Sequence, residues 1–184
     1  DLCTRADIAN AASAPQGPMG PLYPGTCRHA AIGADTPLAW SWRIDLARAL
    51  AHTGPLDWHD ERAGTVQATP EMLGDVILAR KDAGTSYHLS VTVDDAAQDV
   101  TDIARGRDLF DATHIHRLLQ ALLGLPTPRY HHHGLIVDTA GERLAKRRQA
   151  PTLLSLRAGG TDPAKLVADM RKALFPIGFA LEEA

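Results

Sequence analysis

One segment, "THIHRLLQALLG" at residues 113–124, constrains the fold of this chain more than any other. Its apolar residues recur three and four positions apart and form one stripe: Ile115, Leu118, Leu119, Leu122 and Leu123. A stripe with this period is typical of an amphipathic helix. Thr113 is the expected N-cap, and Gly124 is expected to end the helix. The segment therefore predicts a helix.

The segment "SYHLSVTVDD" (86–95) shows a different periodicity. Every second residue is aromatic or aliphatic: Tyr87, Leu89, Val91 and Val93. A period of two is typical of a half-buried strand, which we expect here. Aspartates follow at positions 94, 95, 99 and 102. The spacing of Asp95, Asp99 and Asp102 would put them on one face of a helix, as a solvated face or as a magnesium site.

The other segments alternate between strand and helix patterns. Extended structure is expected at 74–82 and 126–138, and as short strands and turns within 39–66. Helices are expected at 5–14, 150–160 and 162–175. This alternation predicts an α/β fold, with α+β as the alternative.

The segment "APQGPMGPLYPGTC" (14–27) holds four Pro and three Gly in fourteen residues, too many breakers for a regular element. Cys3 and Cys27 bracket it. Two cysteines without a secretory signal indicate a reducing compartment, where thiols bind metals or pack. Zinc requires four ligands, so the two thiols alone are too few; Tyr23 and Asp1 are the further candidates, and two packed thiols are the alternative.

The histidines form two groups, of which one is the run at 131–133. Neighbouring residues of a strand point to opposite faces, so these three side chains cannot share one metal. His114 and His116 lie two apart on the expected helix and face different directions. We therefore expect solvated or hydrogen-bonded histidines. Arg105, just before that helix, can bind a carboxylate ligand or pair with Asp108.

Composition excludes some classes of function. With 184 residues, 45% hydrophobic and 22% charged, the chain resembles an ordinary soluble globular protein. A net charge of −3 provides no overall cationic field for nucleic acid, so polyanion binding requires a local patch. No apolar run approaches the roughly 20 residues of a membrane helix, and no signal peptide is recognisable. We expect a cytoplasmic monomer.

The segment "GERLAKRRQA" (141–150) is a local cationic patch, with four basic residues among six: Arg143, Lys146, Arg147 and Arg148. Three interpretations are open from composition. The patch is a solvated surface, a nuclear-import or RNA-binding element, or a loop that holds a phosphate.

Taken in order, these motifs resemble a known family. Residues 74–133, from "GDVILARKD" to "YHHH", are similar to the second half of the catalytic domain of glutamyl-tRNA synthetases, and more closely to their shortened bacterial paralogues, the glutamyl-Q tRNA(Asp) synthetases. Residues 3–29 resemble the zinc-binding insertion of those paralogues. The resemblance implies a class I synthetase with a Rossmann-type core. It also implies activation of glutamate with ATP and transfer to the queuosine base of tRNA(Asp).

The resemblance also implies roles for individual residues. Tyr87 and Arg105 match the glutamate-binding Tyr and Arg, and a phenol with a guanidinium can together fix a carboxylate. The loop at 143–147 matches the KMSKS signature with the residues Arg143, Leu144, Ala145, Lys146 and Arg147. Lys146 matches the lysine that contacts ATP, a substrate that enters with Mg²⁺. Its ammonium would stabilise the charge of the leaving pyrophosphate.

The zinc site implied by the resemblance uses Cys3, Tyr23 and Cys27, which match three of the four ligands of the insertion. Asp1 stands where the family has the fourth ligand, a cysteine. Aspartate can also ligate zinc. The phosphate loop departs from the family as well, with Arg143 in place of the first lysine of the signature.

The expected domains are a zinc-binding insertion (1–36), the second half of the catalytic core (37–160) and a C-terminal helix (161–184). The family's N-terminal half, with its HIGH-type ATP motif, is expected to precede Asp1 in a longer protein, so the 184 residues alone are expected not to form the adenylate. The chain stops soon after the phosphate loop, which favours the shortened paralogue. The alternatives are a non-catalytic, zinc-stabilised RNA-binding remnant and a fragment of an ordinary glutamyl-tRNA synthetase.

Overall fold

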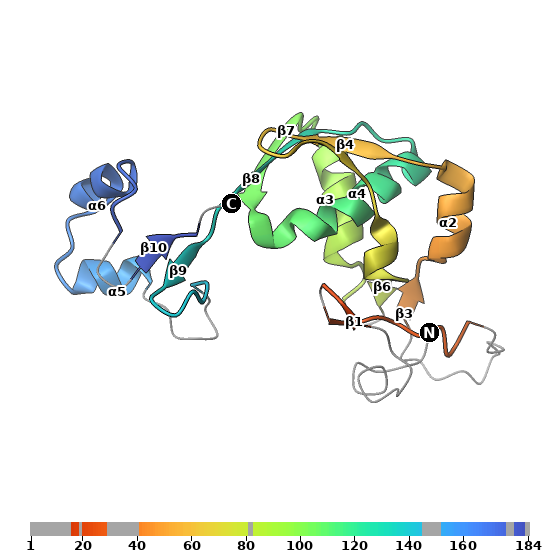
Figure 1. The fold of residues 1–184 in the computed structure, drawn as a ribbon, viewed down its shortest axis with the longest axis horizontal. Helices are drawn as coiled ribbons and strands as arrows, with labels where there is room; N and C mark the ends of the chain where they lie inside the picture. Colours follow the sequence, from red (N-terminus) through yellow and green to blue (C-terminus); the bar gives the residue numbers. More distant parts are fainter. Residues whose placement is uncertain are drawn as a thin grey trace. The chain divides into compact units, whose positions relative to one another are not determined.

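The computed structural model describes residues 16–18, 20–28, 41–80, 83–144, 152–175 and 179–182. Its helices and strands fall into two compact units (Figure 1). Unit 1 comprises residues 1–104 and 109–131, and unit 2 comprises residues 105–108 and 132–184. Each unit combines helices and strands, so the mixed α/β content expected from the sequence is confirmed.

Helix α4 (Phe110–Leu123) contributes the most deeply buried residues of unit 1 and confirms the helix expected from the apolar stripe. It begins at Phe110, earlier than expected, and the Thr113 hydroxyl donates to the Leu109 carbonyl within the helix instead of capping it. The helix ends at Gly124 with a left-handed φ of 64°. Leu118 has no exposed surface, whereas Leu123, at the end of the stripe, is 49% exposed.

Helix α2 (Leu46–Thr53) corrects the expectation of only short strands and turns within residues 39–66. Asp45 caps it, since its carboxylate accepts a hydrogen bond from the backbone N–H of Arg48 at 3.2 Å. Leu46 is buried in the same core cluster as Leu118. The 3₁₀ helix η1 (Pro70–Leu73) contributes the buried Leu73 to this cluster.

The described strands before residue 134 form a pair of two strands, a sheet of four and a small hairpin. Strands β3 (Ser41–Arg43) and β6 (Ile77–Arg80) pair antiparallel, and β6 confirms the strand expected at 74–82. A four-stranded sheet has the order β5-β4-β8-β7. Its strands are β4 (Asp57–Asp60), β5 (Gly64–Gln67), β7 (Asp102–Gly106) and β8 (Arg129–His133). Strand β4 pairs antiparallel with β5 and parallel with β8.

A small hairpin lies within the breaker-rich segment, where no regular element was expected. Strand β1 (Gln16–Gly17) pairs antiparallel with β2 (Gly20–Pro21). A Cβ at Gly17 would lie 2.7 Å from the Met72 carbonyl oxygen, so the hairpin packs directly against η1 and a side chain does not fit there. The helix expected at 5–14 lies outside the described residues.

Helix α3 (Tyr87–Ala97) occupies the segment in which a half-buried strand was expected, so that prediction is wrong. Ser86 caps the helix, because its hydroxyl accepts a hydrogen bond from the backbone N–H of Leu89. Thr92 is buried at 3% exposure, while Val93, one of the alternating residues, is 41% exposed. The helix packs against α4, and this tertiary contact outweighs the strand preference of the β-branched residues.

Asp95, Asp99 and Asp102 do not share a helix face, which corrects that expectation, because only Asp95 lies in α3. The helix ends at Ala97, Asp99 lies beyond it with φ 53°, and Asp102 begins β7. Asp102 forms an ion pair with Arg129 at 2.6 Å. Within the described residues, no three His, Cys, Asp or Glu side chains gather in a way that could hold a metal ion.

The two histidines of α4 are buried and hydrogen-bonded, in agreement with the sequence. His114 is 5% exposed, and its Nδ1 accepts a hydrogen bond from the backbone N–H of Thr69 at 3.1 Å. His116 is 2% exposed, and its Nε2 lies 3.1 Å from Nδ1 of His88 on α3. These rings therefore connect α4 to η1 and to α3.

The burial of His114 predicts a dependence of stability on pH. Desolvation lowers the pKa of His114 below its usual value of 6.5, although Asp111 and Glu71 oppose the shift. The unfolded chain then binds this proton more readily than the folded chain. The free energy of unfolding contributed by this group is therefore constant above pH 6.5 and falls as the pH drops below it.

The contribution of His114 to the pH dependence of stability can be measured by urea denaturation of His114→Asn. In this variant the amide oxygen can replace Nδ1 as the acceptor. The variant should lose less stability between pH 7.5 and pH 5.5 (about two pH units across the usual histidine range) than the parent. His59→Asn, at an exposed histidine of β4, is the matched control and should follow the parent. If the free energy of unfolding changed equally with pH in the two variants, His114 would be excluded as the source of the pH dependence.

Unit 2 carries the C-terminal elements. Strands β9 (Ile136–Asp138) and β10 (Phe179–Leu181) pair antiparallel, and the helices are α5 (Leu153–Ala158) and α6 (Pro163–Met170). Thr152 caps α5 through reciprocal hydrogen bonds with Ser155, and Asp162 caps α6. Both expected helices are confirmed. None of the helices in the described part of the chain combines the length and apolarity that crossing a membrane requires.

Candidate functional site

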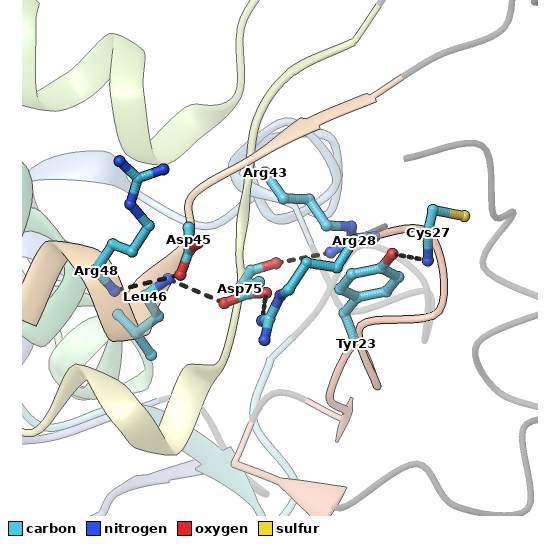
Figure 2. Close-up of polar contacts among 8 residues, drawn as sticks. All are labelled: Tyr23, Cys27, Arg28, Arg43, Asp45, Leu46, Arg48 and Asp75. Carbon is cyan, nitrogen blue, oxygen red and sulfur yellow. Dashed lines mark hydrogen bonds and ion pairs between the residues drawn. The ribbon is translucent and has the colours of Figure 1, made fainter. Parts of the chain in front are cut away.

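Asp75 connects the turn at 23–28 to the core of unit 1 (Figure 2). Its side chain is almost fully buried and forms an ion pair with Arg28. Its Oδ1 accepts a hydrogen bond from the backbone N–H of Leu46 at 3.0 Å, and its carbonyl oxygen accepts one from Arg43 Nη1 at 2.9 Å. The hydrogen bond with Asp75 raises the pKa of Arg28. One aspartate therefore holds the turn, the end of β3 and the start of α2 together.

The turn brings together two of the expected zinc ligands, Tyr23 and Cys27. The Tyr23 hydroxyl oxygen accepts a hydrogen bond from the backbone N–H of Cys27 at 2.6 Å (Figure 2). The guanidinium carbon of Arg43 lies 4.3 Å from the centre of the Tyr23 ring. Cys27 is a thiol and not half of a disulfide. Cys3 and Asp1 lie outside the described residues.

The surroundings of Tyr23 fit a metal ligand. A tyrosine binds zinc through its phenolate oxygen, which carries a negative charge. The N–H of Cys27 donates a hydrogen bond to that oxygen, and the guanidinium of Arg43 lies over the ring, so both neighbours present positive charge to the phenol. The thiol of Cys27, on the same turn, is a second ligand of the type that zinc prefers.

A cavity of about 390 Å³ opens beside this turn in unit 1. The polar residues that line it are Tyr23, Arg43, Asp75, Arg80, Tyr87 and His88. Tyr87 is the first residue of α3 and is half exposed. The structure thus places the expected glutamate-binding tyrosine at a cavity with tyrosines and arginines in its wall.

Two histidines fix the position of Tyr87. Its ring makes edge contacts with the rings of His88 and His116, at centroid distances of 5.9 Å and 5.7 Å. The two imidazoles are themselves joined by their 3.1 Å hydrogen bond. The buried His116 therefore links the tyrosine at the cavity to the centre of α4.

Arg105, the expected glutamate-binding arginine, lies in unit 2 at the end of β7. Only 9% of the residue is exposed. Its Nε donates a hydrogen bond to Nε2 of His132 at 3.0 Å. Burial alternates along β8, so His132 is buried while His131 and His133 are exposed, as expected for a histidine run in a strand.

Asp108, which the sequence offered as an alternative partner of Arg105, forms an ion pair with Arg143. Arg143 bridges to Val137, and the backbone N–H of Leu144 donates to the Ile136 carbonyl at 3.0 Å. The start of the expected phosphate loop is thus fastened to β9. The remaining loop residues, Ala145, Lys146 and Arg147, lie outside the described residues.

Most of the chain matches a known protein family. Residues 46–177 match the family described as "tRNA synthetases class I (E and Q), catalytic domain". This range includes α2 and the residues discussed above from Asp75 to Arg143.

Two similar curated relatives are both named glutamyl-Q tRNA(Asp) synthetase. A glutamyl-Q tRNA(Asp) synthetase of Rhodobacter capsulatus is 52% identical over 180 residues, covering 89% of this chain and 63% of the relative. A glutamyl-Q tRNA(Asp) synthetase of Deinococcus radiodurans is 39% identical over 182 residues, covering 96% of this chain and 59% of the relative. The chain therefore spans about three fifths of the length of these relatives. A solved glutamate tRNA ligase of Elizabethkingia meningosepticum aligns with 52% of this chain and 19% of its own, at 26% identity and a TM-score of 0.45.

Proposed function

Since this chain belongs to the class I tRNA synthetases (E and Q) by its catalytic-domain sequence, we propose that the protein activates glutamate with ATP and transfers it to the queuosine base of tRNA(Asp). The observation that carries the proposal is the identity with glutamyl-Q tRNA(Asp) synthetases over most of this chain. In the first step a glutamate carboxylate oxygen attacks the α-phosphorus of ATP and pyrophosphate leaves. In the second step the acceptor attacks the acyl carbon of the adenylate and AMP leaves.

Tyr87 and Arg105 are the proposed glutamate-binding residues. The position of Tyr87 at a cavity, with its ring held by His88 and His116, supports a binding role. The near-complete burial of Arg105 also supports it, because a guanidinium shielded from water binds a carboxylate more strongly than an exposed one. The proposal gives Arg105 the charge and Tyr87 the hydrogen-bonding hydroxyl.

Lys146 and the loop at 143–147 are the proposed contacts of ATP, which enters with Mg²⁺. Positive charge at the triphosphate would lower the barrier to the departure of pyrophosphate, which carries the developing negative charge. Because Arg143 forms an ion pair with Asp108, its proposed role is to anchor the start of the loop. Lys146 would then be the cation that contacts phosphate.

We also propose that Zn²⁺ is held by Cys3, Tyr23 and Cys27, with Asp1 as the fourth ligand. The metal would supply a structural crosslink to the segment at 14–27, whose prolines and glycines disfavour regular secondary structure. The placement of the Tyr23 hydroxyl beside Cys27 on the same turn supports a pair of ligands there. The link through Asp75 would connect that crosslink to the cavity wall.

Replacing Tyr23 by phenylalanine is expected to weaken zinc binding by more than about tenfold, because the ligand oxygen is lost while the ring under Arg43 is kept. Zinc content after dialysis and competition with a chromophoric chelator measure the affinity. Tyr87→Phe is the matched control, since it also removes one phenol from unit 1, and it should bind zinc like the parent. Equal zinc affinity in both variants would remove Tyr23 from the ligand set.

Two assays on the full-length protein test the proposed function. Glutamate-dependent exchange between ATP and pyrophosphate tests activation. Transfer of labelled glutamate to tRNA(Asp) that contains queuosine, against the same tRNA with guanosine at that position, tests the acceptor. We expect exchange, and labelling of the queuosine-containing tRNA alone.

The other outcomes distinguish the alternatives. Labelling of tRNA(Glu) in place of queuosine-containing tRNA(Asp) would indicate an ordinary glutamyl-tRNA synthetase. Absence of exchange by the full-length protein, with retained tRNA binding, would indicate a non-catalytic RNA-binding protein.

A further inference from the structure

The hydrogen bond between Arg105 and His132 joins two nearly buried polar side chains of neighbouring strands. Arg105 is on β7 and His132 is on β8, which are adjacent in the sheet. The residues are 9% and 2% exposed, and Nε of the arginine lies 3.0 Å from Nε2 of the histidine. A contact of this kind is strong, because one partner is charged and water competes weakly for it.

The direction of this hydrogen bond determines the state of the histidine. Guanidinium nitrogens only donate, so Nε2 of His132 must accept and its lone pair must be unprotonated. The ring is therefore neutral, with its proton on Nδ1. A protonated ring would place a second cation against Arg105 in a buried position.

The same contact determines how Arg105 can meet a ligand. A guanidinium binds a carboxylate with two parallel hydrogen bonds, either along the side that includes Nε or at the end formed by Nη1 and Nη2. His132 occupies Nε. A bidentate carboxylate is thereby directed to the Nη1–Nη2 end. A rotation of the side chain that presented another edge to the carboxylate would break the hydrogen bond to His132.

We propose that His132 is a positioning residue of the glutamate site: as a neutral acceptor at Nε, it orients Arg105 so that the guanidinium presents its Nη1–Nη2 end to the carboxylate of glutamate. This inference rests on the proposed function for the role of Arg105. It goes beyond that function by adding a residue to which the sequence alone assigns no role in binding.

Three variants of the full-length protein test this role in glutamate-dependent ATP–pyrophosphate exchange. His132→Leu removes the acceptor. His132→Gln restores one, because its amide oxygen can reach the position of Nε2. His131→Leu changes the exposed neighbour on the opposite face of β8 and is the matched control.

His132→Leu is expected to raise KM for glutamate about 10- to 100-fold, while KM for ATP stays within about twofold. His132→Gln should recover most of this loss, and His131→Leu should behave like the parent. This pattern would not follow from a general loss of folding, which lowers the active fraction without changing either KM.

An unchanged KM for glutamate in His132→Leu would overturn the inference while the parent still shows exchange. An equal rise of both KM values, or no recovery in His132→Gln, would show a structural role and would also overturn it. Absence of exchange in the parent protein would instead contradict the proposed function. If His132→Leu does not fold, the comparison of His132→Gln with His132→Asn, whose shorter amide cannot reach the Nε2 position, decides by the same KM for glutamate.

Discussion

Replacing Arg105 by leucine is expected to lower kcat/KM for glutamate at least about a hundredfold, the largest effect we predict for a single substitution in this chain. The reason is the near-complete burial of this side chain. Loss of the guanidinium leaves the glutamate carboxylate without its countercharge in a place where water cannot replace it. Glutamate-dependent ATP–pyrophosphate exchange by the full-length protein measures the effect, with KM for ATP as the internal reference.

Two further variants give this experiment its controls. Arg105→Lys keeps the charge but loses both the fork and the Nε donor to His132, so it should recover only a small part of the activity. Arg129→Leu removes an exposed arginine from the adjacent strand β8 and should keep parental activity. Full activity of Arg105→Leu would exclude this residue from the glutamate site.

Replacing Leu118 by alanine is expected to lower the free energy of unfolding by about 2–5 kcal/mol. Leu118 has no exposed surface and lies in the core cluster where α4 meets α2 and η1. The substitution removes apolar contacts and leaves a cavity that the rigid surroundings only partly fill. A loss of this size is a large share of the roughly 5–15 kcal/mol that stabilises a typical domain.

Leu123→Ala is the matched control for that measurement. It makes the same chemical change on the same helix, but Leu123 is 49% exposed. Urea denaturation followed by circular dichroism should show a loss of no more than about 1 kcal/mol for this variant. Similar losses for the two variants would contradict the placement of α4 at the centre of the core.

Parts of the fold follow from local patterns. The apolar stripe predicts α4 because apolar residues three and four positions apart return to the same helix face at each turn. The N-cap of α6 is visible in the dipeptide Asp162–Pro163. Helix α3 is missed because its alternating apolar residues coincide with a strand period over a short distance. Ser86 is the signal that could have revealed it, since it stands in the N-cap position.

The candidate site was less predictable than the fold, for a physical reason. The resemblance marks Tyr87 and Arg105, but their supporting contacts come from residues far along the chain. His116 reaches Tyr87 from α4, and His132 reaches Arg105 from β8. Alternation along β8 shows that one histidine of the run is buried, yet only the pairing of β8 with β7 identifies its partner.

The links made by Asp75 couple two distant parts of unit 1 thermodynamically. Its carboxylate contacts Arg28 through one oxygen and the backbone N–H of Leu46, in the first turn of α2, through the other. Any ligand whose binding to the turn at 23–28 strengthens this arrangement must also stabilise the first turn of α2 against local opening. By reciprocity, a change that opens the first turn of α2 weakens binding of the ligand by the same free energy. Hydrogen exchange at the Leu46 amide would therefore report whether a ligand occupies the turn at 23–28, more than fifteen residues away in the sequence.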